Sequence, residues 1–243
     1  MVYMKVYDNV IKETLDILKD YEYRELRINK DVVWNCLKNN EFLMEREIAF
    51  ELGHRINPCT VYNCPTSNDQ LIDEDRILLY GKDLNEIKGN TNFSRITFMN
   101  VDKVEDPNKA YIGIKRLEYE RFKVIPEGYM ILSSSIENKE NVRVSKKAVK
   151  KGINFEIIGN LFINHYKKIE GVNNVWMIFL VGDYPFTDDL VKKSLEVDTI
   201  TNAFDHILKN VIVDCAVCPL EIICDDIEAL RELHFDVNKK EGK

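Results

Sequence analysis

The sequence predicts an α+β protein in which a mixed sheet is packed with helices. Segments with apolar residues at helical spacing occur along the chain, and so do segments rich in β-branched and aromatic residues. These segments do not follow the strict strand–helix alternation of a parallel α/β sheet. Hydrophobic residues make up 45% of the 243 residues, which is enough for a well-buried core.

Residues 1–45 are expected to be a helical N-terminal extension. The apolar spacing in residues 4–20 predicts one helix, and residues 30–39 predict a second with Val32, Val33 and Leu37 facing inward. Residues 53–75 contain proline and polar residues that interrupt regular structure. They are therefore expected to be mostly loop, with at most a short strand.

Residues 46–210 are expected to form one α+β domain. The predicted strands are 76–80, 95–101, 142–144 and 174–182, and the predicted helices are 108–123, 146–151, 155–168 and 187–209. The run NVWMIFLVG at 174–182 is apolar throughout, which predicts burial on both faces of a sheet. Ser145 is a suitable N-cap for the short helix 146–151, and Gly152 suits its left-handed C-terminal turn.

The composition disfavours two classes of partner. The net charge of −7 is unfavourable for non-specific nucleic-acid binding, which depends on neutralising phosphates. No apolar run approaches the roughly 18–20 residues that a membrane span needs. The N-terminus is charged and amphipathic and lacks the apolar block of a signal peptide, so a cytoplasmic protein is expected.

Six cysteines in such a chain do not indicate disulfides, because cytosolic thiols stay reduced. Cys215, Cys218 and Cys224 form a C-x2-C-x5-C motif in residues 211–243, the expected C-terminal metal-binding segment. Two thiolates two residues apart can reach one metal centre, and a third nearby supplies most of the ligands of an iron–sulfur cluster or a zinc ion. Zinc is the alternative, because thiolates suit both metals.

A filled site needs a fourth ligand. The candidates are Cys36, Cys59, Cys64 and His234. Cys59 and Cys64 lie beside prolines in the predicted loop, where they are expected to be accessible, and Cys64 is the candidate we select. The alternative for any of the cysteines is a buried small hydrophobic residue.

Residues 143–152, RVSKKAVKKG, followed by Phe155, Gly159 and a helix to Lys168, resemble a segment of one known family. That family is carbon monoxide dehydrogenase/acetyl-CoA synthase, in the central domain of its beta subunit. Further similar segments at residues 50–53, 66–73 and 79–87 keep the family's order. From residue 48 to about residue 224 the chain resembles that central domain and the start of the family's iron–sulfur cluster domain.

The resemblance implies a [4Fe–4S] cluster. The family's motif is C-x2-C-x8-C followed by a fourth cysteine; Cys215 and Cys218 match its first two positions, and Cys224 corresponds to the third with a spacing three residues shorter. His234 stands ten residues beyond Cys224, where the family has cysteine. The simpler interpretation of His234 is a histidine at a helix C-terminus, which the helix dipole favours.

The resemblance also implies that coenzyme A is a possible ligand, because the family's central domain is implicated in binding it. Arg143 is the residue carried over for this role, since a guanidinium can hold a phosphate through two hydrogen bonds. Lysines 146, 147, 150 and 151 extend the basic cluster. The alternative is a solvated, charged helix face.

The chain departs from the family in ways that bear on activity. It contains no Cys-Gly-Cys motif, which forms the family's nickel site, it lacks the large domain that contacts the dehydrogenase, and Asn141 replaces a tryptophan. We therefore expect an electron-transfer or accessory protein of anaerobic one-carbon and acetyl-CoA metabolism, with a redox, corrinoid or nickel protein as a possible partner. The alternatives are a divergent enzyme subunit for carbonyl or acetyl-CoA chemistry and a binding module stapled by zinc.

Overall fold

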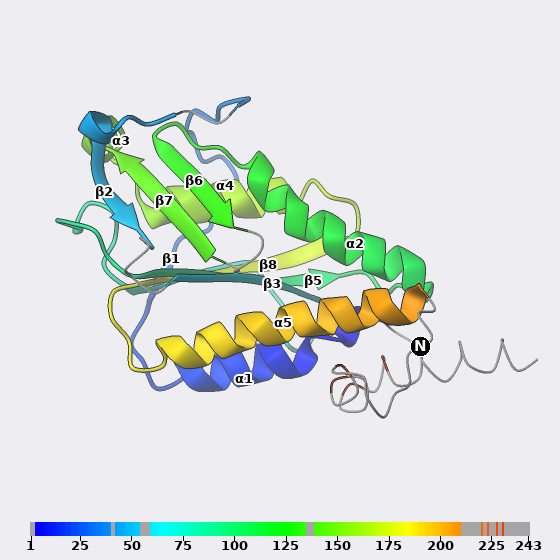
Figure 1. The fold of residues 1–243 in the computed structure, drawn as a ribbon. Coiled ribbons are helices and arrows are strands. Elements are labelled where there is room, and N and C mark those ends of the chain that lie inside the picture. Colours follow the sequence, from blue (N-terminus) through cyan, green and yellow to red (C-terminus); the bar gives the residue numbers. More distant parts are fainter. Residues whose placement is uncertain are drawn as a thin grey trace, which may run out of the picture.

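The computed structural model describes residues 3–39, 42–53, 59–134 and 139–209, and four single residues, Leu220, Ile223, Ile227 and Leu230. A five-stranded mixed sheet lies at the centre, with helices on both faces and a smaller sheet on one of them (Figure 1). The predicted α+β class, with a mixed sheet packed with helices, is confirmed.

The central sheet has the strand order β1-β4-β8-β5-β3. Its strands are β1 (Arg24–Leu26), β3 (Cys59–Thr66), β4 (Arg76–Gly81), β5 (Phe93–Val101) and β8 (Val172–Val181). β8 is parallel to β4 and antiparallel to β5, and β5 is parallel to β3. Residues 175–181 of β8 are all buried, which confirms the burial predicted for this run.

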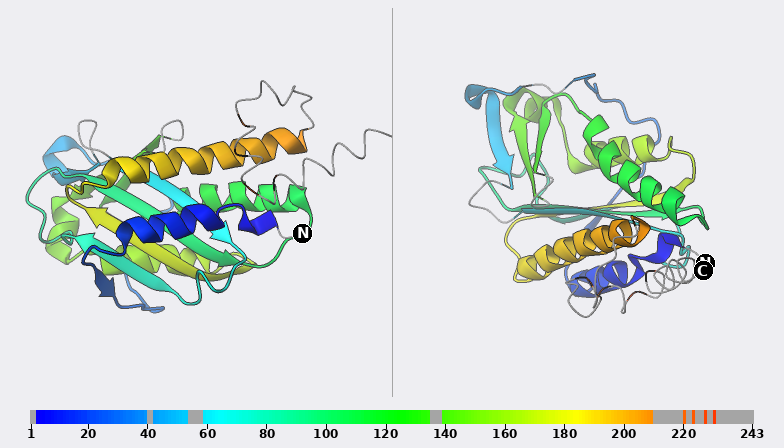
Figure 2. Two further views of the ribbon diagram at one scale, coloured as in Figure 1. Left: turned by 90° about the horizontal axis from the view of Figure 1, so that it is seen from below. Right: turned by 45° about the vertical axis from the view of Figure 1, so that its right-hand side comes forward.

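Two helices cover one face of this sheet, α1 (Asp8–Leu18) and α5 (Thr187–Leu208) (Figures 1 and 2). The residues of α1 that face the core include Val10, Ile11 and Leu18. Just before α1, the Tyr7 hydroxyl lies 2.7 Å from Thr201 Oγ1 of α5, a buried hydrogen bond that ties the two segments together. Both helices confirm the sequence prediction to within a turn.

The opposite face carries a three-stranded antiparallel sheet and three helices (Figure 1). The small sheet has the order β2-β7-β6, from β2 (Ile48–Leu52), β6 (Tyr129–Ser134) and β7 (Lys139–Ser145), and the helices are α2 (Pro107–Glu120), α3 (Lys146–Lys151) and α4 (Phe155–Tyr166). Three short 3-10 turns, η1 (Tyr3–Lys5), η2 (Glu45–Glu47) and η3 (Arg121–Lys123), complete the elements in the ranges described.

Close packing holds α4 against the central sheet. Gly159 lies over Ile77 of β4, and a Cβ at this glycine would come within 2.8 Å of Ile77 Cδ1. The helix therefore needs glycine here, because any larger residue would push α4 away from β4.

Two predictions about the first part of the chain are wrong. Residues 30–39 do not form a helix; Leu37 N donates to Ile125 O, Cys36 forms a β-bridge with Pro126, and Val33 is 91% exposed. The backbone of this segment instead pairs with residues 125–127, where Glu127 N also donates to Asn35 O. Upstream of this segment, β1 pairs with β4 and joins the central sheet.

The second correction concerns residues 53–75. Residues 59–66 form β3, which pairs with β5 over its whole length. Pro65 suits this strand because an edge strand pairs on one side only and can lack an N–H on the other.

In the part of the chain that the structure describes, no helix combines the length and apolar character needed to cross a membrane.

Candidate functional site

The three motif cysteines, Cys215, Cys218 and Cys224, lie outside the described residues, and so does His234. Apolar residues around them are described: Leu220 and Ile223, which stand between Cys218 and Cys224, pack against the core, as does Ile227. Leu230 is fully buried. These four residues are the ones that the structure describes beyond residue 209.

Cys64 has a different environment from the one expected. It lies in β3, and its side chain is fully buried, so the prediction of an accessible loop cysteine is wrong. Burial raises the pKa of the Cys64 thiol well above its ordinary value, and the charge of Glu196 raises it further. Because metals bind the thiolate, these surroundings favour a structural thiol. Its role as a cluster ligand stays a prediction.

The other cysteine candidates are placed only in part. Cys36 is exposed and stands in the segment that bridges to Pro126. Cys59 begins β3. Within the described residues, no group of three or more His, Cys, Asp or Glu side chains is arranged to hold a metal ion.

The basic segment at α3 folds as its sequence predicts. Ser145 Oγ accepts a hydrogen bond from Ala148 N at 3.0 Å, and Gly152 closes the helix with φ of +91°. Arg143, two residues before the helix, donates from Nε to Glu51 Oε1 of β2 at 2.8 Å. Arg143 and Glu51 are register partners across β7 and β2. The guanidinium thus serves a cross-strand ion pair, and its carry-over as a coenzyme ligand stays a prediction.

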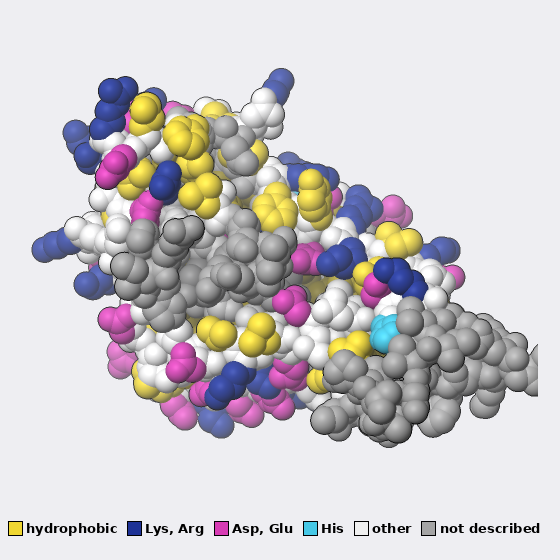
Figure 3. Space-filling view, in the orientation of Figure 1, with side chains coloured by type: hydrophobic (Ala, Val, Ile, Leu, Met, Phe, Trp, Pro, Cys, Tyr) yellow, Lys and Arg dark blue, Asp and Glu magenta, His cyan; other side chains and the backbone are white. Residues whose placement is uncertain are grey.

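An open pocket of about 510 Å³ lies beside α3. It is lined by Leu43, Arg46, Glu47, Ser145, Lys146, Lys147, Lys150 and Lys151. Figure 3 shows Lys and Arg side chains gathered at the end of the molecule where Figure 1 places α3. A pocket of this size can hold a small organic ligand, and its charge favours an anionic one.

Glu127 neutralises part of this basic cluster. Its carboxylate accepts hydrogen bonds from Lys147 at 3.1 Å and Lys151 at 3.2 Å. A hydrogen bond from Asn35 and those from the two lysines lower the pKa of Glu127 to about 2. Lys150, in contrast, makes no ion pair with any described residue.

A second open pocket, of about 540 Å³, lies beside α4 and includes His165 and Cys36 in its lining. His165 Nε2 lies 2.8 Å from Glu120 Oε2, and Lys123 Nζ lies 2.7 Å from the other oxygen. Burial opposes the charge of Glu120, but these two hydrogen bonds keep its pKa below the ordinary value. His165 therefore has a fixed partner, as expected for a structural histidine.

Two arginines that the sequence reasoning missed are buried between the sheets and helices. Arg95 of β5 binds Glu140 of β7 through two parallel hydrogen bonds, Nε to Oε1 at 2.9 Å and Nη2 to Oε2 at 2.5 Å, and both side chains are fully buried. Burial opposes the charge of Glu140, but Arg95 holds the pKa of the carboxyl below its ordinary value. The sequence signal was an arginine inside a strand otherwise buried along its whole length.

The second is Arg121, at the end of α2, which is only 2% exposed. Its Nε and Nη2 atoms have no hydrogen-bond partner among the described residues. Burial lowers the pKa of Arg121, and Glu140 opposes this lowering. The guanidinium lies over the ring of Phe122 at 4.7 Å, but buried donors without a hydrogen bond are unfavourable, so this position calls for an explanation beyond packing.

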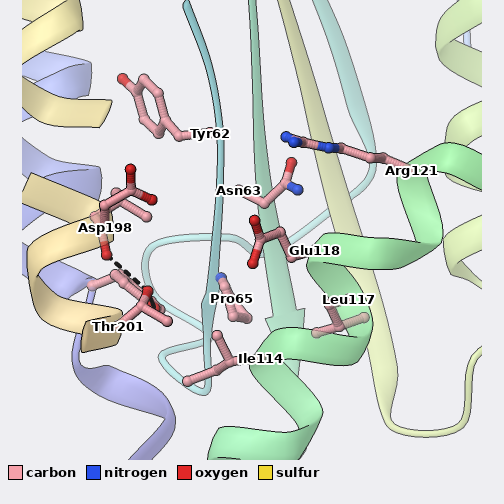
Figure 4. Close-up of a pocket in the computed structure, with 11 residues that line it drawn as sticks. Tyr62, Asn63, Pro65, Ile114, Leu117, Glu118, Arg121, Asp198 and Thr201 are labelled. Atoms are coloured by element: carbon pink, nitrogen blue, oxygen red, sulfur yellow. Dashed lines mark hydrogen bonds between the residues drawn. The ribbon is translucent and has the colours of Figure 1, made fainter. Parts of the chain in front are cut away.

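Arg121 lines a small pocket at the β3 edge of the central sheet, between α2 and α5 (Figure 4). Its side chain points toward Asn63 of β3, with Glu118 of α2 on the same side of the strand, whereas Asp198 of α5 lines the pocket from the other side of β3. In comparisons with known proteins, no protein-family model and no curated protein matches the chain.

Proposed function

We propose that this chain is an iron–sulfur protein related to acetyl-CoA synthase, with a [4Fe–4S] cluster held by Cys215, Cys218 and Cys224. The observation that carries the proposal is the C-x2-C-x5-C motif itself. Three closely spaced thiolates are the usual ligands of such clusters.

The family resemblance supports iron over zinc. In the resembling segment, a strand, a capped short helix, a longer helix and a buried strand follow one another as β7, α3, α4 and β8. This is the order that the resemblance implies before the cluster motif. The function that follows is electron transfer or an accessory role in anaerobic one-carbon and acetyl-CoA metabolism.

For the fourth ligand we place His234 and Cys36 ahead of Cys64. Burial raises the pKa of both thiols, but Cys36 is exposed, whereas Cys64 is fully enclosed in β3 and its pKa is raised well above the ordinary value. The role of Cys64 can still be tested with Cys64→Ser, because serine is close in size to cysteine.

The pocket beside α3 supports coenzyme A as a ligand. Phosphate groups favour a surface rich in lysine and arginine. Arg143 is held by Glu51, so within the pocket Lys150 and Arg46 are the better candidates for contact with phosphate.

The test is anaerobic purification of the full chain, followed by iron and acid-labile sulfide analysis and visible and EPR spectra. We expect a brown protein with about four irons per chain. Cys218→Ser should lose the cluster while keeping its far-ultraviolet circular dichroism. Cys36→Ser, Cys64→Ser and His234→Ala serve as matched comparisons, and the one that also loses iron names the fourth ligand. A colourless protein with stoichiometric zinc would overturn the proposal.

A further inference from the structure

The pocket at the β3 edge has features that the proposed cluster and coenzyme do not use. β3 is the outermost strand of the central sheet, and α2 and α5 flank it on opposite faces (Figures 1 and 4). The lining is Tyr7, Tyr62, Asn63, Pro65, Ile114, Leu117, Glu118, Arg121, Val197, Asp198 and Thr201. The cavity of about 20 Å³ holds one or two water-sized groups, which excludes nucleotides and coenzymes.

Arg121 presents one defined edge of its guanidinium without a partner. That edge consists of Nε and Nη2, which together can bind the two oxygens of one carboxylate. The same two atoms of Arg76 bind Glu25 at 2.8 and 2.7 Å, and those of Arg95 bind Glu140. In both of these arginines the Nε–Nη2 edge binds one carboxylate. Glu140 binds Arg95 through both its oxygens and makes no hydrogen bond to Nε or Nη2 of Arg121.

Asn63 adds a second requirement. Its side chain is 8% exposed, and neither Oδ1 nor Nδ2 has a hydrogen-bond partner among the described residues. An amide donates through one atom and accepts through the other. A molecule that satisfies it must therefore offer both an acceptor and a donor.

The carboxylates around the pocket narrow the ligand further. Glu118 stands one helical turn before Arg121, and Asp198 lies across from it on α5. Lys115 binds Glu118 at 2.7 Å, and the Glu118 side chain remains 32% exposed, so it can turn to admit a ligand. The Glu118 carboxylate disfavours a doubly charged anion such as phosphate, and it can accept a hydrogen bond from a donor.

The remaining walls are fixed. The Tyr62 hydroxyl lies 2.9 Å from Thr14 Oγ1, and that of Tyr7 lies 2.7 Å from Thr201 Oγ1. The hydroxyls of both tyrosines are thus already hydrogen-bonded, and the polar groups that can bind a ligand are those of Arg121, Asn63 and Glu118.

We propose that this pocket binds a small singly charged carboxylate that carries one hydrogen-bond donor, of the size of bicarbonate. The two carboxylate oxygens bind Nε and Nη2 of Arg121. The donor binds Asn63 Oδ1 or the Glu118 carboxylate, and Asn63 Nδ2 donates to a ligand oxygen. Glycine offers the same groups but is larger than the cavity admits, so it serves as the size control.

The experiment measures binding to the full chain by isothermal titration calorimetry in sealed cells. Bicarbonate is compared with nitrate, a planar anion of the same size without a donor, and with glycine, which carries a donor but is larger. We expect bicarbonate to bind at least about tenfold more tightly than either of them, or about 1.4 kcal/mol. Equal binding of bicarbonate and nitrate, tighter binding of glycine, or no binding of bicarbonate would overturn the proposal.

Variants place the binding in this pocket. Arg121→Lys keeps the charge but loses the two-atom edge, and we expect it to weaken binding at least about tenfold. Asn63→Leu should do the same, which keeps the test decisive if the arginine variant folds poorly. Arg116→Met, on the same helix with a 60% exposed side chain, is the matched control and should bind as the unchanged protein does. Unchanged binding in both pocket variants would contradict the assignment.

Discussion

Arg95 and Arg121 are both buried, in neighbouring regions of the molecule, yet their surroundings differ. Between β5 and β7, the guanidinium of Arg95 meets Glu140 through two hydrogen bonds, donates to Thr97 Oγ1 at 3.2 Å and lies over the ring of Phe162. At the β3 edge, Arg121 leaves the corresponding edge without a protein partner among the described residues. A buried charge that serves the fold is paired within the fold. One that is not paired this way marks a place where a ligand can supply the partner.

The largest expected effect comes from breaking the paired region. Glu140→Ala leaves the Arg95 charge buried and unpaired, so we expect the free energy of unfolding to fall by about 3–5 kcal/mol. Urea unfolding followed by circular dichroism measures it. Asp16→Ala, which breaks an exposed pair with Lys19, is the control and should cost less than about 1 kcal/mol. If adding Arg95→Met to Glu140→Ala restores none of the loss, the uncompensated charge is not its cause.

The second prediction concerns the unpaired region. In buffer free of bicarbonate and other carboxylates, Arg121→Met removes a buried charge without breaking an ion pair that the structure shows. We therefore expect the free energy of unfolding to stay the same or to rise by about 1–2 kcal/mol. The same urea unfolding measures it. A loss as large as that of Glu140→Ala would mean that the two arginines have equivalent structural roles.

The smallest effect is expected from acid. Arg95 holds the folded pKa of Glu140 below the ordinary value of 4.5, so its stabilising contribution is present above about pH 4.5 and is lost as pH falls through the folded pKa. Each unit by which the pKa is lowered corresponds to about 1.4 kcal/mol. Unfolding from about pH 7 to about pH 3 should therefore show a shallower loss of stability in the Arg95→Met/Glu140→Leu variant. In Arg121→Met the loss should be only slightly shallower than in the unchanged protein, because Arg121 is a smaller cause of the lowered pKa of Glu140 than Arg95.

Local signals were sufficient to predict several elements. The cap at Ser145 and the terminating Gly152 defined α3, and the apolar run of β8 identified a strand buried on both faces. These features are local because a cap and a burial pattern depend on neighbouring residues.

Other features depend on residues far along the chain. Pro65 favours a loop in the sequence, because proline is disfavoured inside a sheet and the sequence does not show that β3 is an edge strand. The sequence does not show that Arg143 has an ionic partner, because Glu51 comes to lie opposite it only when β2 pairs with β7. The Arg121 pocket joins β3, α2 and α5, which are separated by up to about 140 residues, so no spacing rule could predict it.

The position of β8 has a consequence for how the protein is made. β8 is the middle strand of the central sheet, but it is the last of the five strands along the chain. Until it emerges from the ribosome, β4 with β1 and β5 with β3 form two half-sheets with nothing between them to join them. Joining β4 to β8 closes a loop of about 90 residues, which predicts slow folding. Nascent chains that end before residue 172 should therefore expose strand edges and depend on chaperones.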